Sequence, residues 1–196
     1  MNLTLVTPAA VLPVTVAEVS DHCRLDSPTD ADEALVETYI EAAATWAFGV
    51  SGWTGRSLTD ETFEETFDGW TRRVRSTILS ELPLARAPVR SVASVKYIDT
   101  NGTEQTLASD QHRLVGRNGQ GVIVPAYNVT WPGLRTQEAN VTVRYVAGYG
   151  AEAGGIPQDL RTGLMALVAF MWENRTMAPP DWASAAFRKY QVNWSL

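Results

Sequence analysis

The chain has 196 residues, of which 45% are hydrophobic and 19% charged, a composition typical of a globular protein and not of a disordered one. Its 22 acidic and 16 basic residues give a net charge of −6, which makes it a poor candidate for binding DNA phosphates. A single cysteine, Cys23, excludes an intramolecular disulfide and a cysteine-based metal cluster. We expect neither a signal peptide nor a membrane span, because the first residues lack a basic region and the longest charge-free apolar run, residues 162–172, is too short for a bilayer.

Two helices are predicted near the start of the chain. In the first, residues 15–24, Thr15 and Glu18 have the spacing of a capping box. The second and longer one opens among the acidic residues that follow Asp26, with Thr29 or Asp30 as its cap. Its apolar residues form two stripes, one of Leu35, Tyr39, Ala43, Trp46 and Val50 and the other of Val36, Ile40, Ala44 and Phe48. Two stripes predict that this helix is packed on two sides.

Residues 1–60 hold nine acidic and two basic residues, whereas residues 61–150 hold nine and ten. The acidic face therefore belongs to the first helices. Such a face repels nucleic acid. A helical surface that is simply solvated explains the same residues equally well.

The pattern changes to short strands between residues 59 and 149. Phe63, Glu65 and Phe67 alternate with polar residues, and residues 140–146 alternate in the same way before a glycine-rich exit. The Asn101–Gly102 pair predicts a hairpin turn. Many short strands separated by Gly, Pro and Asn indicate a compact antiparallel sandwich or barrel.

A buried helix is predicted over residues 157–175, where apolar residues recur at helical spacing. The fold class is therefore α+β: a helical body with an inserted antiparallel β-sandwich or barrel-like region and an aromatic tail at the C-terminal end. We expect residues 1–57 to be a helical segment, 58–150 the inserted β-region, 151–178 the helix that completes the body, and 179–196 a tail that binds a partner.

The chain ends with four aromatic residues behind a Pro-Pro pair: Trp182, Phe187, Tyr190 and Trp194. Aromatic side chains dominate the energetics of cores and interfaces, so these four need somewhere to be buried. Either a partner takes them, with Arg188 and Lys189 contacting its acidic groups, or the tail folds back on the chain's own core.

No catalytic constellation is found in the sequence. His22 and Cys23 are adjacent on a helix and point about 100° apart, and His112 stands alone in a predicted strand. The acids from Asp26 to Glu37 partly match a calcium loop, but Ala31 stands where the turn needs glycine. We therefore expect no enzymatic activity, no metal site and no cofactor.

Several segments, in order along residues 8–176, resemble the head–tail connector (adaptor) proteins of long-tailed bacteriophages and of phage-derived gene transfer agents. The segments are PVTVAEVSDHCRLD, the alanine-rich helix ending in TGRSL, LPLARAPVRSVASVKYIDTNGTEQTL, VPAYNVTWPGLR with VTVRYVAGYG, and IPQDLRTGLMALVAFMWENR. The resemblance implies a ring of twelve copies under the portal protein, in the neck of a virion or phage-like particle assembled in the bacterial cytoplasm. Such a ring extends the DNA channel without binding DNA specifically, and a tail-side connector or tail terminator protein docks on it.

The resemblance also implies roles for individual residues. The portal-binding residues would be Trp182, Phe187, Arg188, Lys189, Tyr190 and Trp194. The subunit interface would be formed by Leu35, Tyr39, Trp46, Leu164, Val168 and Trp172, and the channel would be lined by Asp30, Asp32, Glu33, Glu37 and Glu41. No membrane is implied.

The alternative function is a β-sandwich module of a phage tail that binds a glycan or receptor. In that case five aromatic residues would form an exposed platform: Tyr97, Tyr127, Trp131, Tyr145 and Tyr149.

Overall fold

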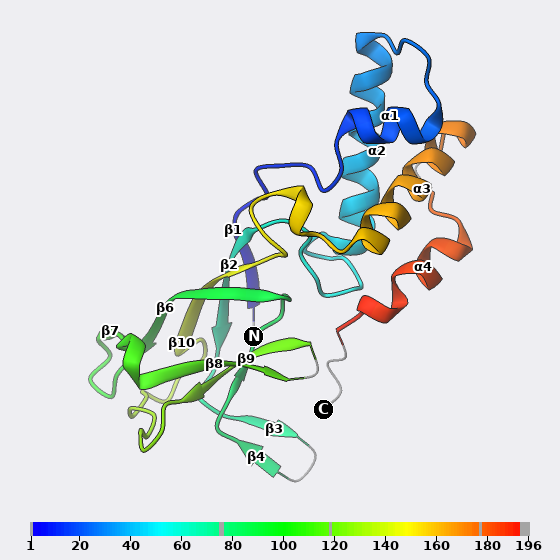
Figure 1. Cartoon of the computed structure of the whole chain (residues 1–196). Coiled ribbons are helices and arrows are strands. Elements are labelled where there is room, and N and C mark those ends of the chain that lie inside the picture. Colours follow the sequence, from blue (N-terminus) through cyan, green and yellow to red (C-terminus); the bar gives the residue numbers. More distant parts are fainter. Residues whose placement is uncertain (1, 75–76, 118, 177, 193–196) are drawn as a thin grey trace. The chain divides into compact units, whose positions relative to one another are not determined.

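The structure is a computed structural model that describes residues 2–74, 77–117, 119–176 and 178–192 (Figure 1). The chain divides into two compact units. The helical unit comprises Ala9–Asp60 and Tyr149–Gln191, and the β unit comprises residues 2–8, Glu61–Gly148 and Val192. The α+β prediction is confirmed.

The helical unit contains α1 (Val16–Cys23), α2 (Asp30–Phe48), α3 (Gln158–Asn174) and α4 (Asp181–Phe187), with the 3₁₀ turns η2 (Ala153–Gly155) and η3 (Arg188–Tyr190). Local sequence explains where α1 and α2 begin. Thr15 and Glu18 form the predicted capping box at α1, and Thr29 with Asp32 forms a second one at α2. The prediction that Thr29 or Asp30 caps α2 is thus resolved in favour of Thr29.

The core of the helical unit lies where α2 and α3 pack together, with α1 against both. From α2 it takes members of both predicted stripes, among them Tyr39, Ala43 and Ile40. From α3 it takes five buried residues: Leu160, Leu164, Leu167, Val168 and Met171. Because side chains from both stripes are buried inside one unit, the helix uses both stripes within its own chain.

The β unit has a five-stranded antiparallel sheet in the order β1-β2-β10-β6-β7. Its strands are β1 (Asn2–Thr7), β2 (Glu61–Phe67), β10 (Val141–Ala147), β6 (Val89–Ile98) and β7 (Glu104–Thr106). A three-stranded sheet follows the order β5-β9-β8, with β5 (Leu82–Pro83), β9 (Gln120–Pro125) and β8 (His112–Arg117), preceded by the 3₁₀ turn η1 (Ser109–Gln111). A two-stranded ribbon joins β3 (Arg72–Val74) to β4 (Thr77–Leu79).

The core of the β unit collects side chains from both larger sheets. Phe63 on β2 and Val143 on β10 belong to the same buried cluster as Leu82 and Ile123 of the smaller sheet. Alternate residues of β2 and β10 are buried, as the period of two requires. The unit is therefore an antiparallel sandwich, and the predicted hairpin is present between β6 and β7, where Gly102 has a φ of +87°.

Two features differ from the expected organisation. Residues 2–7, expected in a helical segment, form an edge strand that pairs with β2, Leu3 lying opposite Glu65. Residues 179–191, expected to be a separate tail, belong to the helical unit. The boundaries of the inserted region, in contrast, lie close to those expected, at residues 60–61 and 148–149.

Candidate partner-binding surfaces

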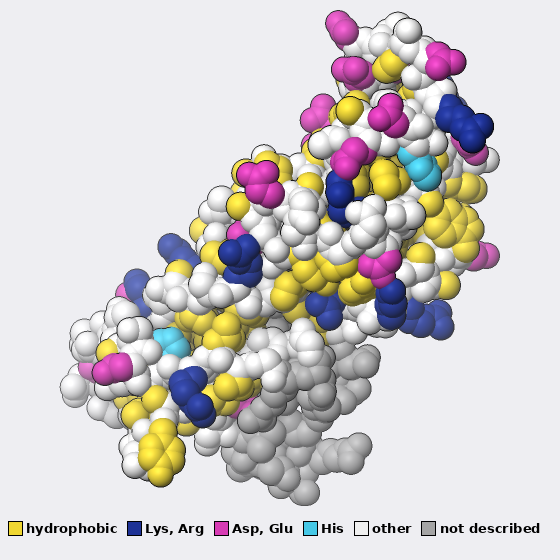
Figure 2. Space-filling view, viewed as in Figure 1, with side chains coloured by type: hydrophobic (Ala, Val, Ile, Leu, Met, Phe, Trp, Pro, Cys, Tyr) yellow, Lys and Arg dark blue, Asp and Glu magenta, His cyan; other side chains and the backbone are white. Residues whose placement is uncertain are grey.

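The outer face of α2 is acidic. Asp30, Glu33, Glu37 and Glu41 follow one another at spacings of three and four residues, and all four are exposed. Figure 2 shows acidic side chains, in magenta, over the helices, where the helical unit has 13 acidic and 6 basic residues, a net charge of −7. The β unit, with 9 acidic and 10 basic residues, is nearly neutral.

Asp32, the fifth predicted channel residue, has a structural role. Its carboxylate accepts hydrogen bonds from the hydroxyl (2.7 Å) and the backbone N–H (3.0 Å) of Thr29. Both hydrogen bonds lower the pKa of Asp32, and the one from the hydroxyl has the larger effect. Asp32 is less exposed than the other four carboxylates and begins the helix that carries them.

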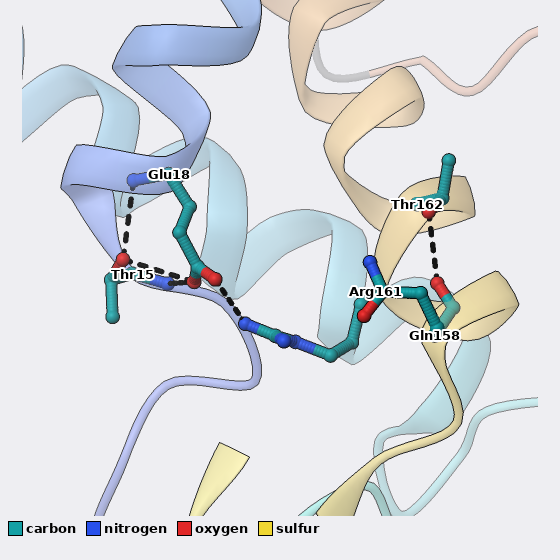
Figure 3. Close-up of polar contacts among 5 residues, drawn as sticks. All are labelled: Thr15, Glu18, Gln158, Arg161 and Thr162. Carbon is teal, nitrogen blue, oxygen red and sulfur yellow. Dashed lines mark hydrogen bonds and ion pairs between the residues drawn. The ribbon is translucent and has the colours of Figure 1, made fainter. Parts of the chain in front are cut away.

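The first turn of α1 is tied to α3 through Glu18 (Figure 3). One carboxylate oxygen of Glu18 accepts from the backbone N–H (2.9 Å) and hydroxyl (3.0 Å) of Thr15, and the other is paired with the guanidinium of Arg161. The backbone hydrogen bond from Thr15 is the main cause that lowers the pKa of Glu18, and Arg161 lowers it further. On α3 itself, the hydroxyl of Thr162 donates to the carbonyl of Gln158 (2.9 Å). One side chain thus caps α1 and fixes α1 against α3.

The six residues predicted for the subunit interface separate into two groups. Tyr39, Leu164 and Val168 are buried in the core of their own chain, so they are not available to a neighbour. This corrects their predicted role, because the stripe pattern could not tell an intramolecular contact from an intermolecular one.

The other three, Leu35, Trp46 and Trp172, are half-buried at the edge of the same core. Trp46 meets Trp53 edge to face, with ring centroids 5.9 Å apart. The guanidinium of Arg175 lies 4.3 Å from the centroid of the Trp172 ring, the position of a cation–π contact. These three keep surface that a neighbouring subunit can contact.

The helix α4 packs on the helical unit through one face. Phe187 and Ala183 are fully buried, and the ring of Phe187 meets that of Phe48 edge to face at 5.1 Å. At the start of α4, Trp182 keeps 44% of its surface exposed, and its ring meets that of Phe170 edge to face, with centroids 6.5 Å apart. The prediction that Phe187 contacts a partner is corrected accordingly, since in this structure its ring lies inside the core.

The turn η3, which follows α4, is held by charged groups. The hydroxyl of Tyr190 donates to the carboxylate of Asp159, 2.6 and 2.7 Å from its two oxygens, and Lys189 forms an ion pair with the same carboxylate. The pKa of Asp159 is lowered to about 2, mainly by its hydrogen bond with Lys189 and next by that with Tyr190. The pKa of Tyr190 is raised to about 12, mainly by desolvation and next by its hydrogen bond to Asp159. Arg56 completes the attachment by donating to the carbonyl of Tyr190.

Of the predicted portal-binding residues, Trp182, Arg188 and Lys189 are exposed, Tyr190 is half-buried, and Trp194 lies outside the described residues. The sequence interpretation missed the residues that hold the tail, among them Phe48, Arg56 and Gly163. No local signal could have found them, because Arg56 and Tyr190 are 134 positions apart.

The aromatic platform of the alternative function does not form. Tyr145 is buried and donates its hydroxyl to Glu65 (3.0 Å), and Tyr149 belongs to the helical unit. Trp131 is stacked on Trp70, with centroids 4.6 Å apart and planes 7° apart. Tyr127 is 86% exposed, and it is the one member of the set that presents most of its ring to solvent.

No helix within the described ranges is long and apolar enough to cross a membrane. In the same part of the chain, no group of three or more His, Cys, Asp or Glu side chains has the arrangement of a metal site.

The model of the head completion protein family matches residues 14–179. No protein of curated function matches the chain. Among solved structures, the chain is similar to one from the neck of an empty gene transfer agent particle computed with C6 symmetry, at 24% identity and a TM-score of 0.77. It is also similar to a chain from the virion of a native gene transfer agent particle, at 25% identity and a TM-score of 0.72. A third similar chain comes from the neck of a native particle computed with C12 symmetry, at 26% identity and a TM-score of 0.69. Each match covers 100% of this chain and 98% of the other. Since the family model spans most of its length, this chain belongs to the head completion protein family.

Proposed function

We propose that this protein is a structural head–tail adaptor that forms a ring in the neck of a phage-like particle, between the portal and the tail. The observation that carries the proposal is the similarity, over the whole chain, to proteins in gene transfer agent necks, one of them computed with C12 symmetry. Twelve copies in a closed ring are the stoichiometry that this symmetry supports. The work of such a protein is geometric, and we propose no catalytic activity.

The charge of the helical unit supports a place beside the DNA path. Asp30, Glu33, Glu37 and Glu41 present four carboxylates on one exposed face of α2. A wall of this sign lets DNA slide, because it offers phosphates no cation to pair with. We propose that this face lines the channel of the ring, and that Leu35, Trp46 and Trp172 contribute to the contact between neighbouring subunits.

The ring itself is tested by producing particles without this protein and adding it back. Capsids that contain portal should bind the purified protein, and electron microscopy of the resulting necks should show a ring of twelve subunits. In the absence of the protein, filled heads and free tails should accumulate separately. Tailed, DNA-retaining particles formed without the protein would refute the proposal.

The channel face is tested by reversing its charge. The Glu37→Lys and Glu41→Lys double variant should retain its fold and its place in the ring but slow DNA ejection, because the new cations pair with phosphates. Asp110→Lys with Glu138→Lys provides the control, since both residues are exposed in the β unit and the change in net charge is the same. Equal DNA ejection rates for the two double variants would show that α2 does not line the channel.

A further inference from the structure

Two side chains of the five-stranded sheet hold a short segment of the chain that lies between two strands. Oε2 of Glu65, on β2, accepts from the backbone N–H of Ala85 (2.8 Å). The hydroxyl of Tyr145, on β10, accepts from the next backbone N–H, that of Arg86 (3.1 Å), and donates to the same Oε2 atom (3.0 Å). We call residues 84–88 the sheet connection, because they follow β5 of the smaller sheet and lead into β6 of the larger one.

The carboxyl of Glu65 is buried and only partly satisfied. Glu65, Tyr145 and Arg86 are each at most 2% exposed. Oε1 of Glu65 is also buried, and it has no hydrogen-bond partner among the described residues. A carboxylate in this place would carry part of its charge on an atom that no protein group solvates, which is costly. Burial accordingly raises the pKa of Glu65 to about 7, against the hydrogen bonds from Ala85 and Tyr145.

Charged groups near this cluster influence Glu65 less than burial does. The guanidinium of Arg86 lies over the ring of Phe63, 5.5 Å from its centroid, in the position of a cation–π contact. Burial lowers the pKa of Arg86, while Glu61 on β2 and Tyr145 raise it. The charge of the amino terminus, ahead of β1, lowers the pKa of Glu65, but by less than either hydrogen bond does. The protonation state of Glu65 therefore depends mainly on whether the cluster stays closed.

The sheet connection is the element that can move away from Glu65 at the lowest cost. β2 is paired on both sides, with β1 and with β10. The sheet connection is held by isolated hydrogen bonds, such as that from Leu84 to the carbonyl of Gly121 (2.9 Å). Another joins the side-chain amide of Gln120 to the carbonyl of Leu84 (3.1 Å). Segments held in this way open locally at a lower free energy than the strands of a core.

We propose that Glu65 is a pH-sensitive latch: the sheet connection stays closed over the protonated carboxyl, and it opens locally when Glu65 loses its proton, while the strands of both sheets remain paired. The proton passes to solvent, and water takes the place of the N–H groups of Ala85 and Arg86 as partners of the two side chains. Opening therefore increases as the pH rises. This inference does not depend on the proposed function.

Amide hydrogen exchange of the whole chain, followed residue by residue and corrected for the intrinsic rate at each pH, tests the latch. The carboxyl has a pKa of about 7 when closed and 4.5 when exposed, so the protection of Ala85 and Arg86 should fall about a hundredfold between pH 4 and pH 7. Low concentrations of urea should leave this exchange unchanged, because local opening exposes little surface. The amides of β10, which is paired on both sides, should exchange more slowly and depend steeply on urea.

Two substitutions on the same strand form a matched pair. Glu65→Gln keeps an acceptor for the sheet connection and cannot ionise, so its protection factors should be the same at pH 4 and pH 7. Glu64→Gln makes the same chemical change on the opposite face of β2, where Glu64 is paired with Arg144 (2.7 Å), and it should keep the pH dependence of the wild type.

Tyr145→Phe covers the case in which Glu65→Gln fails to fold. It removes a hydrogen bond that lowers the pKa of Glu65, so the loss of protection at Ala85 should move to higher pH, and Arg86 should be less protected at every pH. Protection of Ala85 that is flat with pH in the wild type, or that still falls with pH in Glu65→Gln, would overturn the latch. Exchange of Ala85 with the same urea dependence as β10 would also overturn it, because ionisation would then be relieved only by unfolding of the whole β unit.

Discussion

Replacing Glu65 with glutamine should remove a pH dependence from the stability of the β unit. Glu65 lies on β2 among the core phenylalanines and is completely buried. Its Oε2 atom accepts from the backbone N–H of Ala85 (2.8 Å) and from the hydroxyl of Tyr145 (3.0 Å). Burial raises the pKa of this carboxyl from 4.5 to about 7, although the two hydrogen bonds act in the opposite direction.

The magnitude follows from that difference. A carboxyl whose pKa is about 7 in the folded chain and 4.5 in the unfolded chain contributes full stability below pH 4.5 and loses it as the pH rises through 7. The loss is about 3 kcal/mol by pH 9. Glutamine keeps an oxygen for Ala85 and Tyr145 and cannot ionise. Its amide group occupies the place of Oε1, which has no hydrogen-bond partner in the structure, so at about pH 4, below the pKa of the unfolded chain, the variant and the protonated wild type should be similarly stable.

Urea unfolding of both proteins between pH 4 and pH 9 measures this effect, because every other titrating group is common to the two. The free energy of unfolding of Glu65→Gln minus that of the wild type should rise from near zero at about pH 4 to about 3 kcal/mol, with its midpoint at about pH 6, between the two pKa values, and should level off above about pH 7. Glu64→Gln is the control on the same strand: Glu64 lies on the opposite face, paired with Arg144 at 2.7 Å, and its replacement should change stability by less than about 1 kcal/mol. A difference that stays flat across this pH range would show that Glu65 is ionised in the core and would refute the reasoning.

Three further changes test other contacts. Phe187→Ala should lower the free energy of unfolding of the helical unit by about 3–5 kcal/mol, whereas Trp182→Ala on the exposed side of α4 should cost less than about 1, as measured by urea unfolding. Asn140→Ala should lower the free energy of unfolding by about 2 kcal/mol and speed amide hydrogen exchange in residues 126–139, because the Nδ2 atom of Asn140 donates to three carbonyls, including that of residue 135 at 2.8 Å. Unchanged exchange would contradict this. A double-mutant cycle of Glu18→Gln and Arg161→Met should give a coupling energy of about 1 kcal/mol that weakens in 1 M salt. A coupling energy of zero would show that this ion pair does not hold α1 against α3.

Local patterns were sufficient for most elements of the fold. A capping box located the start of α1, a cap at Thr29 or Asp30 located the start of α2, and the Asn101–Gly102 pair located the β6–β7 hairpin. The alternation along β2 even placed Glu65 on the same side as Phe63 and Phe67, where the structure has it. Each of these signals is contained within a few neighbouring residues, which is why sequence alone could give it.

The features that sequence did not give depend on distant partners. The strand β1 exists because it pairs with β2, and the two are about sixty positions apart. Whether Phe187 is a partner contact or a core residue depends on the space above Gly163, and the attachment of η3 depends on Asp159 and Arg56. Composition indicated that the tail aromatics need burial, but it could not indicate that Phe187 is buried in its own chain while Trp182 stays exposed.

The path of the chain between the two units has a mechanical consequence. The polypeptide passes from one unit to the other at residues 8–9, 60–61 and 148–149, each time between described segments. A pulling force between the units is therefore shared by three covalent connections in parallel, and cutting any one of them leaves two intact. In a neck that carries the load between a pressurised head and a tail, each subunit would then resist rupture and a single proteolytic nick better than two domains joined by one linker.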